Sequence, residues 1–310
     1  MLKTREPRVR RLLHRKRRRA EPRKAELMKI TTLVNEHCQL GENPLWHREE
    51  GSLYWEDIEG GKVHRFHPAS GKHQVIYHGE RVGGFTFQAN GDLLLFRVHD
   101  LALLRPDGQV KMLREFFDDG MERFNDVIAD PEGRVFAGTI GKTAESGGLY
   151  RVDVDGSVTL LLRGSGCSNG MGFSPDLAKF YWTCSTRRRI YQVDYERTTG
   201  ALTGERIFYQ ATPDEGIPDG LTVDNSGHVW SARWDGSAVI HHAPDGKVVK
   251  KIPFPVAKVS SLCFGGPNLD QCFVTTAGGR PGSSTEDGSV YQCAAGVAGP
   301  AEFKSRTGLR

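Results

Sequence analysis

The chain has 310 residues, of which 38% are hydrophobic and 26% are charged, and its formal net charge at pH 7 is +4. A chain of this length can bury a sizeable core. It contains no apolar run near the roughly 18 residues that a membrane-spanning helix needs, and its N-terminus has no secretory h-region. We therefore expect no membrane partner and a cytoplasmic location.

The positive charge is concentrated at the N-terminus. Residues 1–25 hold twelve Lys or Arg and only two acids, Glu6 and Glu21. The basic run at residues 10–19 could contact nucleic acid or an acidic surface. We favour a disordered leader over residues 1–28, upstream of a natural start at Met28, and do not expect nucleic acid as a partner. Removing residues 1–27 should leave activity and melting behaviour nearly unchanged.

From Glu42 onward the sequence repeats itself every 41 to 50 residues. Each unit starts with a short motif that turns apolar, and further short β-branched and aromatic runs follow, bounded by Gly, Asp, Asn and Pro. Such runs predict strands joined by hairpins. In chain order the units open with E-N-P-L-W at 42, G-G-F-T-F at 83, N-D-V-I-A at 125, N-G-M-G-F at 169, D-G-L-T-V at 219 and S-S-L-C-F at 260.

Six units of about four strands each predict an all-β fold, a six-bladed β-propeller with four antiparallel strands per blade around a central channel. We expect this domain to occupy residues 29–310. The extended segment at residues 30–36 is expected to close the ring by pairing with the last blade, and residues 301–306 to add an outer strand. The pattern leaves open which end supplies the closing strand.

Four of the six units carry a carboxylate or carboxamide side chain at the same position. In a propeller, equivalent positions are related by rotation about the axis, so these side chains should face one another at one mouth of the channel. Asn and Asp before Gly are also common turn formers, but clustered buried carboxylates are costly unless they are paired or metal-bound. The four residues are Glu42, Asn125, Asn169 and Asp219.

An all-oxygen set of this kind suits a hard divalent cation such as Ca²⁺, Mg²⁺ or Mn²⁺. Zinc is less expected, because the set contains no His or Cys. We therefore expect one divalent cation as cofactor, with Ca²⁺ preferred. A serine nucleophile is not expected: G-C-S-N-G at residues 166–170 resembles a nucleophile elbow only superficially.

Longer segments carry a family resemblance. They are G-E-N-P-L-W (41–46), R-F-N-D-V-I-A-D-P-E-G-R-V-F-A-G-T (123–139), S-N-G-M-G-F-S-P-D (168–176), G-I-P-D-G-L-T-V-D-N-S-G-H-V-W (216–230) and S-L-C-F-G-G-P-N-L-D (261–270). In order and spacing these segments closely resemble the motifs of the senescence-marker-protein/gluconolactonase/luciferin-regenerating-enzyme family. The resemblance extends from Glu42 to at least Gly278.

The resemblance implies a six-bladed propeller that hydrolyses sugar lactones with one divalent metal in its channel. It implies that Glu42, Asn169 and Asp219 bind the metal, with Asn125 close to it, and that Asp219 is also the catalytic base. Arg123 and Asn125 are implied to contact the lactone. In such a mechanism the cation polarises the carbonyl and Asp219 takes a proton from the attacking water.

One segment departs from the family pattern. Animal members often carry an acidic lid loop after the G-T motif, whereas residues 141–144 here read G-K-T-A. Glu145 is a substitute for the missing acid in one interpretation, but we favour an ordinary solvated loop. Which lactone is the substrate therefore stays open at this point.

Two rival functions remain. A metal-dependent phosphotriesterase or arylesterase would use a similar propeller and a similar cation. A non-enzymatic propeller that binds ligands or proteins would need no converging carboxylates, so Glu42 and Asp219 argue against it.

The remaining candidate residues are interpreted as structural. The six cysteines form no C-x-x-C pair and should be reduced. We interpret Cys167 as a small packing residue and Trp234 as core or turn packing. The histidines of the predicted strands and turns are expected to be solvated or hydrogen-bonded and not ligands; they are His64, His67, His73, His78, His99, His228, His241 and His242.

Overall fold

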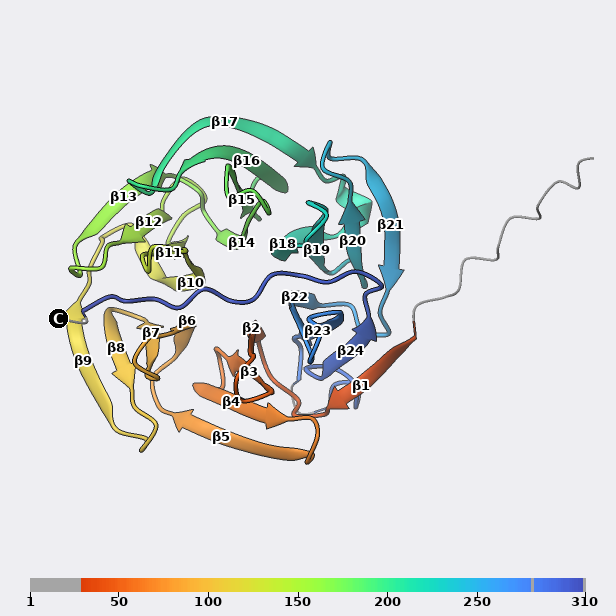
Figure 1. The fold of residues 1–310 in the computed structure, drawn as a ribbon. Coiled ribbons are helices and arrows are strands. Elements are labelled where there is room, and N and C mark those ends of the chain that lie inside the picture. The colour runs from red at the N-terminus through yellow and green to blue at the C-terminus, as the bar shows by residue number, and fades with distance from the viewer. Residues whose placement is uncertain (1–28, 280–281, 309–310) are drawn as a thin grey trace, which may run out of the picture.

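The structure is a computed structural model that describes residues 29–279 and 282–308. Its strands form six four-stranded antiparallel sheets, which are arranged as blades around a central axis (Figure 1). The predicted six-bladed β-propeller is confirmed. Within the described ranges the only helical element is one 3-10 turn, η1 (Pro213–Glu215). The leader predicted for residues 1–28 lies outside the described residues.

Each of the first five blades takes four consecutive strands, with the first strand innermost. Blades one and two are β2 (Gly41–His47), β3 (Ser52–Asp57), β4 (Lys62–His67) and β5 (Lys72–His78), then β6 (Val82–Phe87), β7 (Leu93–Arg97), β8 (Asp100–Leu104) and β9 (Val110–Glu115). Blades three and four are β10 (Met121–Ala129), β11 (Val135–Gly141), β12 (Gly148–Val152) and β13 (Val158–Arg163), then β14 (Ser168–Phe173), β15 (Lys179–Cys184), β16 (Arg189–Glu196) and β17 (Ala201–Gln210). Blade five is β18 (Ile217–Val223), β19 (Val229–Trp234), β20 (Ala238–His242) and β21 (Val248–Pro253).

The sixth blade joins the two ends of the chain. Its strands are β22 (Val259–Gly265), β23 (Gln271–Thr276), β24 (Val290–Ala294) and, as the outermost strand, the N-terminal β1 (Ile30–Val34). Strand β1 pairs antiparallel with β24. The expected pairing of the N-terminal segment with the last blade is confirmed, and β1 is the closing strand that the sequence pattern had left open. Backbone hydrogen bonds between β1 and β24 hold the ring shut.

The expectation that residues 301–306 add an outer strand is wrong. The C-terminal strap, defined here as residues 295–308, instead crosses the face of the ring (Figure 1) and forms one isolated parallel bridge, between Gln88 and Ser305. It cannot extend blade six because β1 already occupies that edge. Its backbone bonds to turns that follow the inner strands, including Asn225 to Ala298 (2.9 Å) and Arg306 to the Gly133 carbonyl (2.8 Å).

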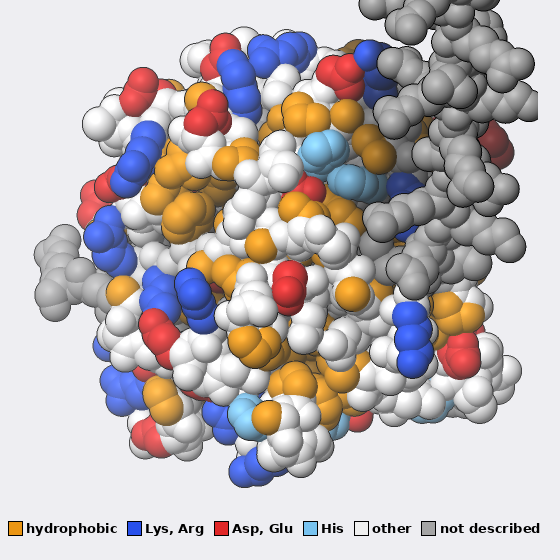
Figure 2. Space-filling view, turned by 45° about the vertical axis from the view of Figure 1, so that its right-hand side comes forward, with side chains coloured by type: hydrophobic (Ala, Val, Ile, Leu, Met, Phe, Trp, Pro, Cys, Tyr) orange, Lys and Arg blue, Asp and Glu red, His pale blue; other side chains and the backbone are white. Residues whose placement is uncertain are grey.

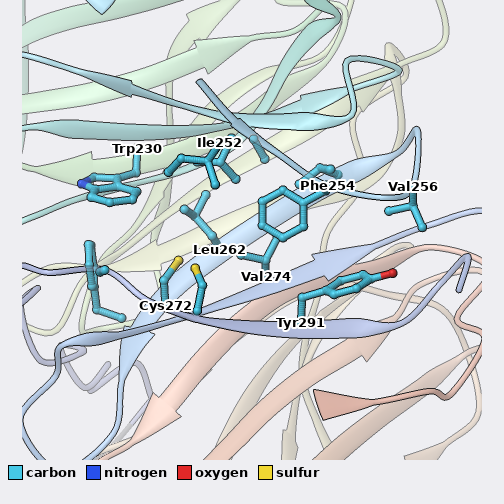
Figure 3. Close-up of a cluster of buried hydrophobic side chains, with 14 residues drawn as sticks. Trp230, Ile252, Phe254, Val256, Leu262, Cys272, Val274 and Tyr291 are labelled. Atoms are coloured by element: carbon cyan, nitrogen blue, oxygen red, sulfur yellow. The ribbon is translucent and has the colours of Figure 1, made fainter. Parts of the chain in front are cut away.

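The hydrophobic core lies between the blades. Figure 3 shows the cluster between blades five and six, where Trp230 and Ile252 meet Leu262, Val274 and Tyr291. Similar clusters lie at the other five blade interfaces. Full burial of one such side chain stabilises a protein by about 1.5–3 kcal/mol, so these clusters fix each blade against its neighbours and hold the inner strands in place.

The face in Figure 2 carries apolar areas with acidic and basic side chains scattered among them, and neither charge dominates its described part. No helix in the described ranges is long and apolar enough to cross a bilayer.

Candidate active site

The four polar residues of the repeat lie on four inner strands and line one cavity. Glu42 is on β2, Asn125 on β10, Asn169 on β14 and Asp219 on β18, and each is at most 8% exposed. The cavity they share has a volume of about 380 Å³, and Arg123 also lines it. The structure thus brings together every residue that the sequence nominated for the metal, the substrate or catalysis.

An irregularity in strand pairing accompanies each of the four polar residues. Such β-bulges bend a strand and re-aim its side chains, which lets a polar residue of an inner strand turn to the channel. The pairing of the inner strand shifts between Glu42 and Leu45, Phe124 and Val127, Asn169 and Met171, and Pro218 and Leu221.

Close packing of the inner strands explains which blades carry no polar ligand. A Cβ on Gly83, the equivalent position in blade two, would lie 2.0 Å from the Phe124 carbonyl oxygen. In blade six the equivalent residue, Ser260, bonds to a backbone carbonyl of blade one. The residue after Asn169 is under the same constraint, because a Cβ on Gly170 would lie 2.2 Å from the backbone nitrogen of Leu221.

A hydrogen-bond network orders the ligands of blades four and five. The amide of Asn169 donates from Nδ2 to Oδ1 of Asp219 and, at 3.2 Å, to Oγ of Ser185. Ser185 in turn donates to the carbonyl of Pro218 at 2.7 Å. The Asn169 and Asp219 side chains are therefore fixed relative to each other.

A second set of hydrogen bonds fixes Arg123 and Asn125. Nη1 of Arg123 donates to Oδ1 of Asn125 at 2.7 Å and to the carbonyl of Phe124 at 2.9 Å. The amide of Asn125 donates to the carbonyl of Ser168 at 3.0 Å. The guanidinium is thus anchored at the cavity, and it retains donor groups that a bound molecule can use.

The electrostatics of the cavity favour a cation. Burial, together with Asp219 and Asp126, raises the pKa of Glu42 well above its usual value. Burial and Asp126 do the same to Asp219, although Asn169 and Arg123 act in the opposite direction. The guanidinium of Arg123 does not offset the negative charge of these acids, and a divalent cation would supply further positive charge. The residues present, with oxygen donors on three or four strands, fit a hard divalent cation.

The walls of the cavity are apolar. Leu40, Ile140, Ile217 and Trp234 line it beside the polar residues. The interpretation of Trp234 as core or turn packing is therefore wrong. The ring is partly exposed, and Nζ of Lys258 lies 4.3 Å from its centroid, a cation–π contact that orients it.

Comparison with known proteins decides the relationship. The family described as the SMP-30/gluconolactonase/LRE-like region matches residues 40–278. The chain belongs to this family. Pentonolactonase XacC of Haloferax volcanii is 40% identical over 90% of this chain and 98% of its own, and 6-deoxy-6-sulfogluconolactonase of Pseudomonas putida is 31% identical over 88% of this chain and 97% of its own. A solved structure described as a calcium-binding protein, regucalcin from Agrobacterium tumefaciens, superimposes with a TM-score of 0.83 at 26% identity, covering 91% of this chain and 97% of the other.

In this member of the SMP-30/gluconolactonase/LRE-like family the loop after β11 does not reach the cavity. Residues 142–145 are exposed, and Glu145 is not among the residues that line the cavity. The interpretation of a solvated loop is confirmed, and the cavity carries no acid from this position.

Cys167 lines the cavity, contrary to its interpretation as a packing residue. Its sulfur lies 3.9 Å from Nδ2 of Asn169 and 4.0 Å from Nδ2 of Asn125. Burial and Asp219 raise the pKa of this thiol to about 12. The sulfur is therefore neutral at pH 7, and a nucleophilic thiolate is not available here. All six cysteines are free, as expected.

Two carboxylates beside the site were missed, one half-buried and one fully buried. Asp126 follows Asn125 directly, and burial raises its pKa to about 7. Glu56 is fully buried opposite Glu42 in the β2–β3 pairing, and burial and Asp126 raise its pKa well above the usual value. The N-D pair at residues 125–126 was a signal for Asp126. Glu56 lies outside the repeated position, so the repeat gave no signal for it.

A third missed carboxylate lies at the far end of the channel. Glu302, on the C-terminal strap, lines a small cavity of about 50 Å³ with Asp126. Burial and Asp126 raise the pKa of Glu302 to about 7. The strap therefore places a carboxyl group at the end of the channel opposite the active-site mouth.

Proposed function

We propose that the protein hydrolyses sugar lactones to the corresponding aldonic acids, in the cavity at the channel mouth and with one divalent cation. The observation that carries the proposal is the convergence of Glu42, Asn169 and Asp219 with Arg123 and Asn125 on one cavity of about 380 Å³. Small-molecule sites commonly have volumes of about 300–1,000 Å³. The lactonase names of the relatives support the same substrate class.

Glu42, Asn169 and Asp219 are the proposed cation ligands, with Asn125 next to them. The amide of Asn169 can present its oxygen to the cation after a half-turn about its last side-chain bond, whereas Oδ1 of Asn125 stays the acceptor of Arg123. Bound there, a divalent cation would supply Lewis-acid polarisation of the lactone carbonyl. Ca²⁺ is our first choice because the donors are all oxygen and a structural relative is described as calcium-binding.

The protein side chains divide the remaining work. Asp219 accepts a proton from the water that adds to the lactone carbonyl carbon, and it can return this proton to the ring oxygen when the C–O bond breaks. Arg123, anchored on Asn125, donates hydrogen bonds to sugar oxygens. Trp234 and Ile140 cover apolar faces of the substrate and reduce water access.

A substrate panel tests the proposal. Pentono-, glucono- and galactonolactones are compared with aryl esters and organophosphates, each after chelation and after adding back Ca²⁺, Mg²⁺, Mn²⁺ or Zn²⁺. We expect turnover of sugar lactones that chelation abolishes and a divalent cation restores. Preferential cleavage of organophosphates or aryl esters would favour the rival hydrolase, and undiminished lactonase activity after chelation would refute the cation's role. Binding without turnover of any substrate would favour a non-enzymatic propeller.

A further inference from the structure

Two groups of side chains away from the active-site cavity hold three potential metal ligands each. One comprises Asp224, His228 and His241. Its carboxylate is already engaged, because Asp224 accepts hydrogen bonds from Nε1 of Trp230 (2.9 Å) and from the backbone of His228 (3.0 Å). The contacts of this group are therefore explained by the turn that follows the inner strand of blade five, which they stabilise.

The other group, which we call the seam cluster, comprises Glu36, His64 and His73. Glu36 lies between β1 and β2, in the segment that leads from the closing strand of blade six into blade one. His64 is on β4 and His73 on β5, both in blade one. The cluster therefore connects the segment that closes the ring to the blade it enters.

The geometry of the seam cluster is close to that of a metal site. Nδ1 of His64 lies 3.1 Å from Nε2 of His73, and Nδ1 of His73 lies 3.5 Å from Oε2 of Glu36. One ligand atom of each residue lies within 4.8 Å of the others. Ligand atoms at about 2.0–2.1 Å from a tetrahedral zinc ion are about 3.3 Å apart. Each imidazole can offer only one nitrogen to an ion, so a bound ion would replace one of the two contacts of His73, and the ligand atoms would close from within 4.8 Å to about 3.3 Å.

Both imidazoles of the cluster are prepared for a cation. Burial is the main cause that lowers the pKa of His64 to about 3. Burial also lowers the pKa of His73. Both rings are therefore neutral at pH 7, the state in which imidazole binds metals. The indole of Trp55 stacks on both rings, with centroid distances of 4.8 and 5.3 Å, and restricts their rotation.

Solvent reaches the cluster on one side. His64 is fully buried, whereas the side chains of His73 and Glu36 are 24% and 25% exposed. A cation can enter there, and water can complete its coordination. Lys62 contacts Glu36 from Nζ to Oε1 at 3.8 Å, and its flexible side chain can move outward when a cation takes its place.

We propose that Glu36, His64 and His73 form a second metal site, selective for Zn²⁺ or a similar transition-metal ion, which clamps the closing segment of the ring to blade one. Two imidazoles and one carboxylate suit Zn²⁺, Co²⁺ or Ni²⁺ and do not suit Ca²⁺ or Mg²⁺. The site thus differs in selectivity from the all-oxygen site of the cavity. Metal bound to the folded protein alone also stabilises it, so occupancy should resist opening of the ring.

The test uses full-length protein without a histidine tag, stripped of metal and then saturated with Ca²⁺ so that oxygen sites are occupied. Zn²⁺ is titrated by calorimetry, and melting is followed with and without Zn²⁺. We expect one Zn²⁺ per chain and a higher melting temperature. His73→Ala and Glu36→Gln should each weaken Zn²⁺ binding at least tenfold and abolish the rise in melting temperature.

The matched control is His67→Ala. His67 is on the same strand as His64, but its ring bonds to Oγ of Ser70 at 2.8 Å, so this variant should bind Zn²⁺ like the wild type. Co²⁺ should give a visible absorption band in the wild type and in His67→Ala that His73→Ala lacks. The proposal is overturned if the wild type binds no Zn²⁺, if both seam variants bind it as tightly as the wild type, or if binding is lost in His241→Ala instead.

Discussion

Ser185 holds Asn169 in place, with its hydroxyl oxygen 3.2 Å from Nδ2 of the amide. The hydroxyl also donates to the carbonyl of Pro218, next to Asp219. We predict that Ser185→Ala loosens both proposed ligands. The Kd of the cation should rise, and kcat/KM should fall, each by about 3- to 10-fold, which is the size expected for the loss of roughly 1 kcal/mol of hydrogen bonding. Metal titration and lactone kinetics measure this. Ser70→Ala, at an exposed turn, should change neither quantity.

Loss of a proposed ligand carboxylate should be far more severe. Asp219→Asn removes the proposed base and a ligand, so we expect kcat to fall by at least about 10³-fold. Glu42→Gln should lower both cation content and kcat. Elemental analysis of the dialysed variants, together with rates at saturating lactone, measures the two effects. Glu145→Gln, in the exposed loop, should behave as wild type, and a large loss there would show that this loop serves catalysis.

Glu302 should make stability depend on pH. Its folded-state pKa is raised from 4.5 to about 7, so between these values the folded state keeps a proton that the unfolded state has lost. Stability therefore falls as the pH rises through this window. We predict that Glu302→Gln is as stable as the wild type near pH 4.5 and more stable above pH 7.5, by about 1–3 kcal/mol. Urea unfolding at both pH values measures this, and an equal stability difference at the two pH values would contradict it.

The closing strand should dominate the stability of the ring. Deleting residues 1–34 removes β1 and exposes the edge of β24, so we expect a loss of several degrees in melting temperature or aggregation of the protein. Deleting residues 1–27 leaves β1 in place and is the matched control, with unchanged melting and activity. Thermal melts and size-exclusion chromatography distinguish the two. Equal behaviour of the two truncations would mean that closure needs no β1.

The repeat predicted the inner strands because one physical constraint acts on all of them. Each inner strand must carry small or polar residues where the strands crowd the axis, and this requirement recurs at Glu42, Asn125, Asn169 and Asp219. Residues that are not subject to this constraint could not be predicted as cavity-lining residues from the repeat. Trp234 and Cys167 line the cavity because of how neighbouring blades place them, which a pattern within one blade does not encode.

The ends of the chain show the same limit. The alternation around residues 30–36 predicted a strand, and β1 is one. A similar extended pattern at residues 301–306 predicted a strand that does not exist, because an extended segment can bond to a sheet edge or to a series of turns. Which of these occurs depends on whether the edge is free, and β1 had already taken it.

The strap determines at which end of the channel a substrate can enter and a product can leave. It crosses the face opposite the mouth, and Glu302 lines the small cavity at that end of the channel. Under the proposed reaction, a lactone would therefore enter, and the acid formed from it would leave, at the active-site mouth, away from the strap.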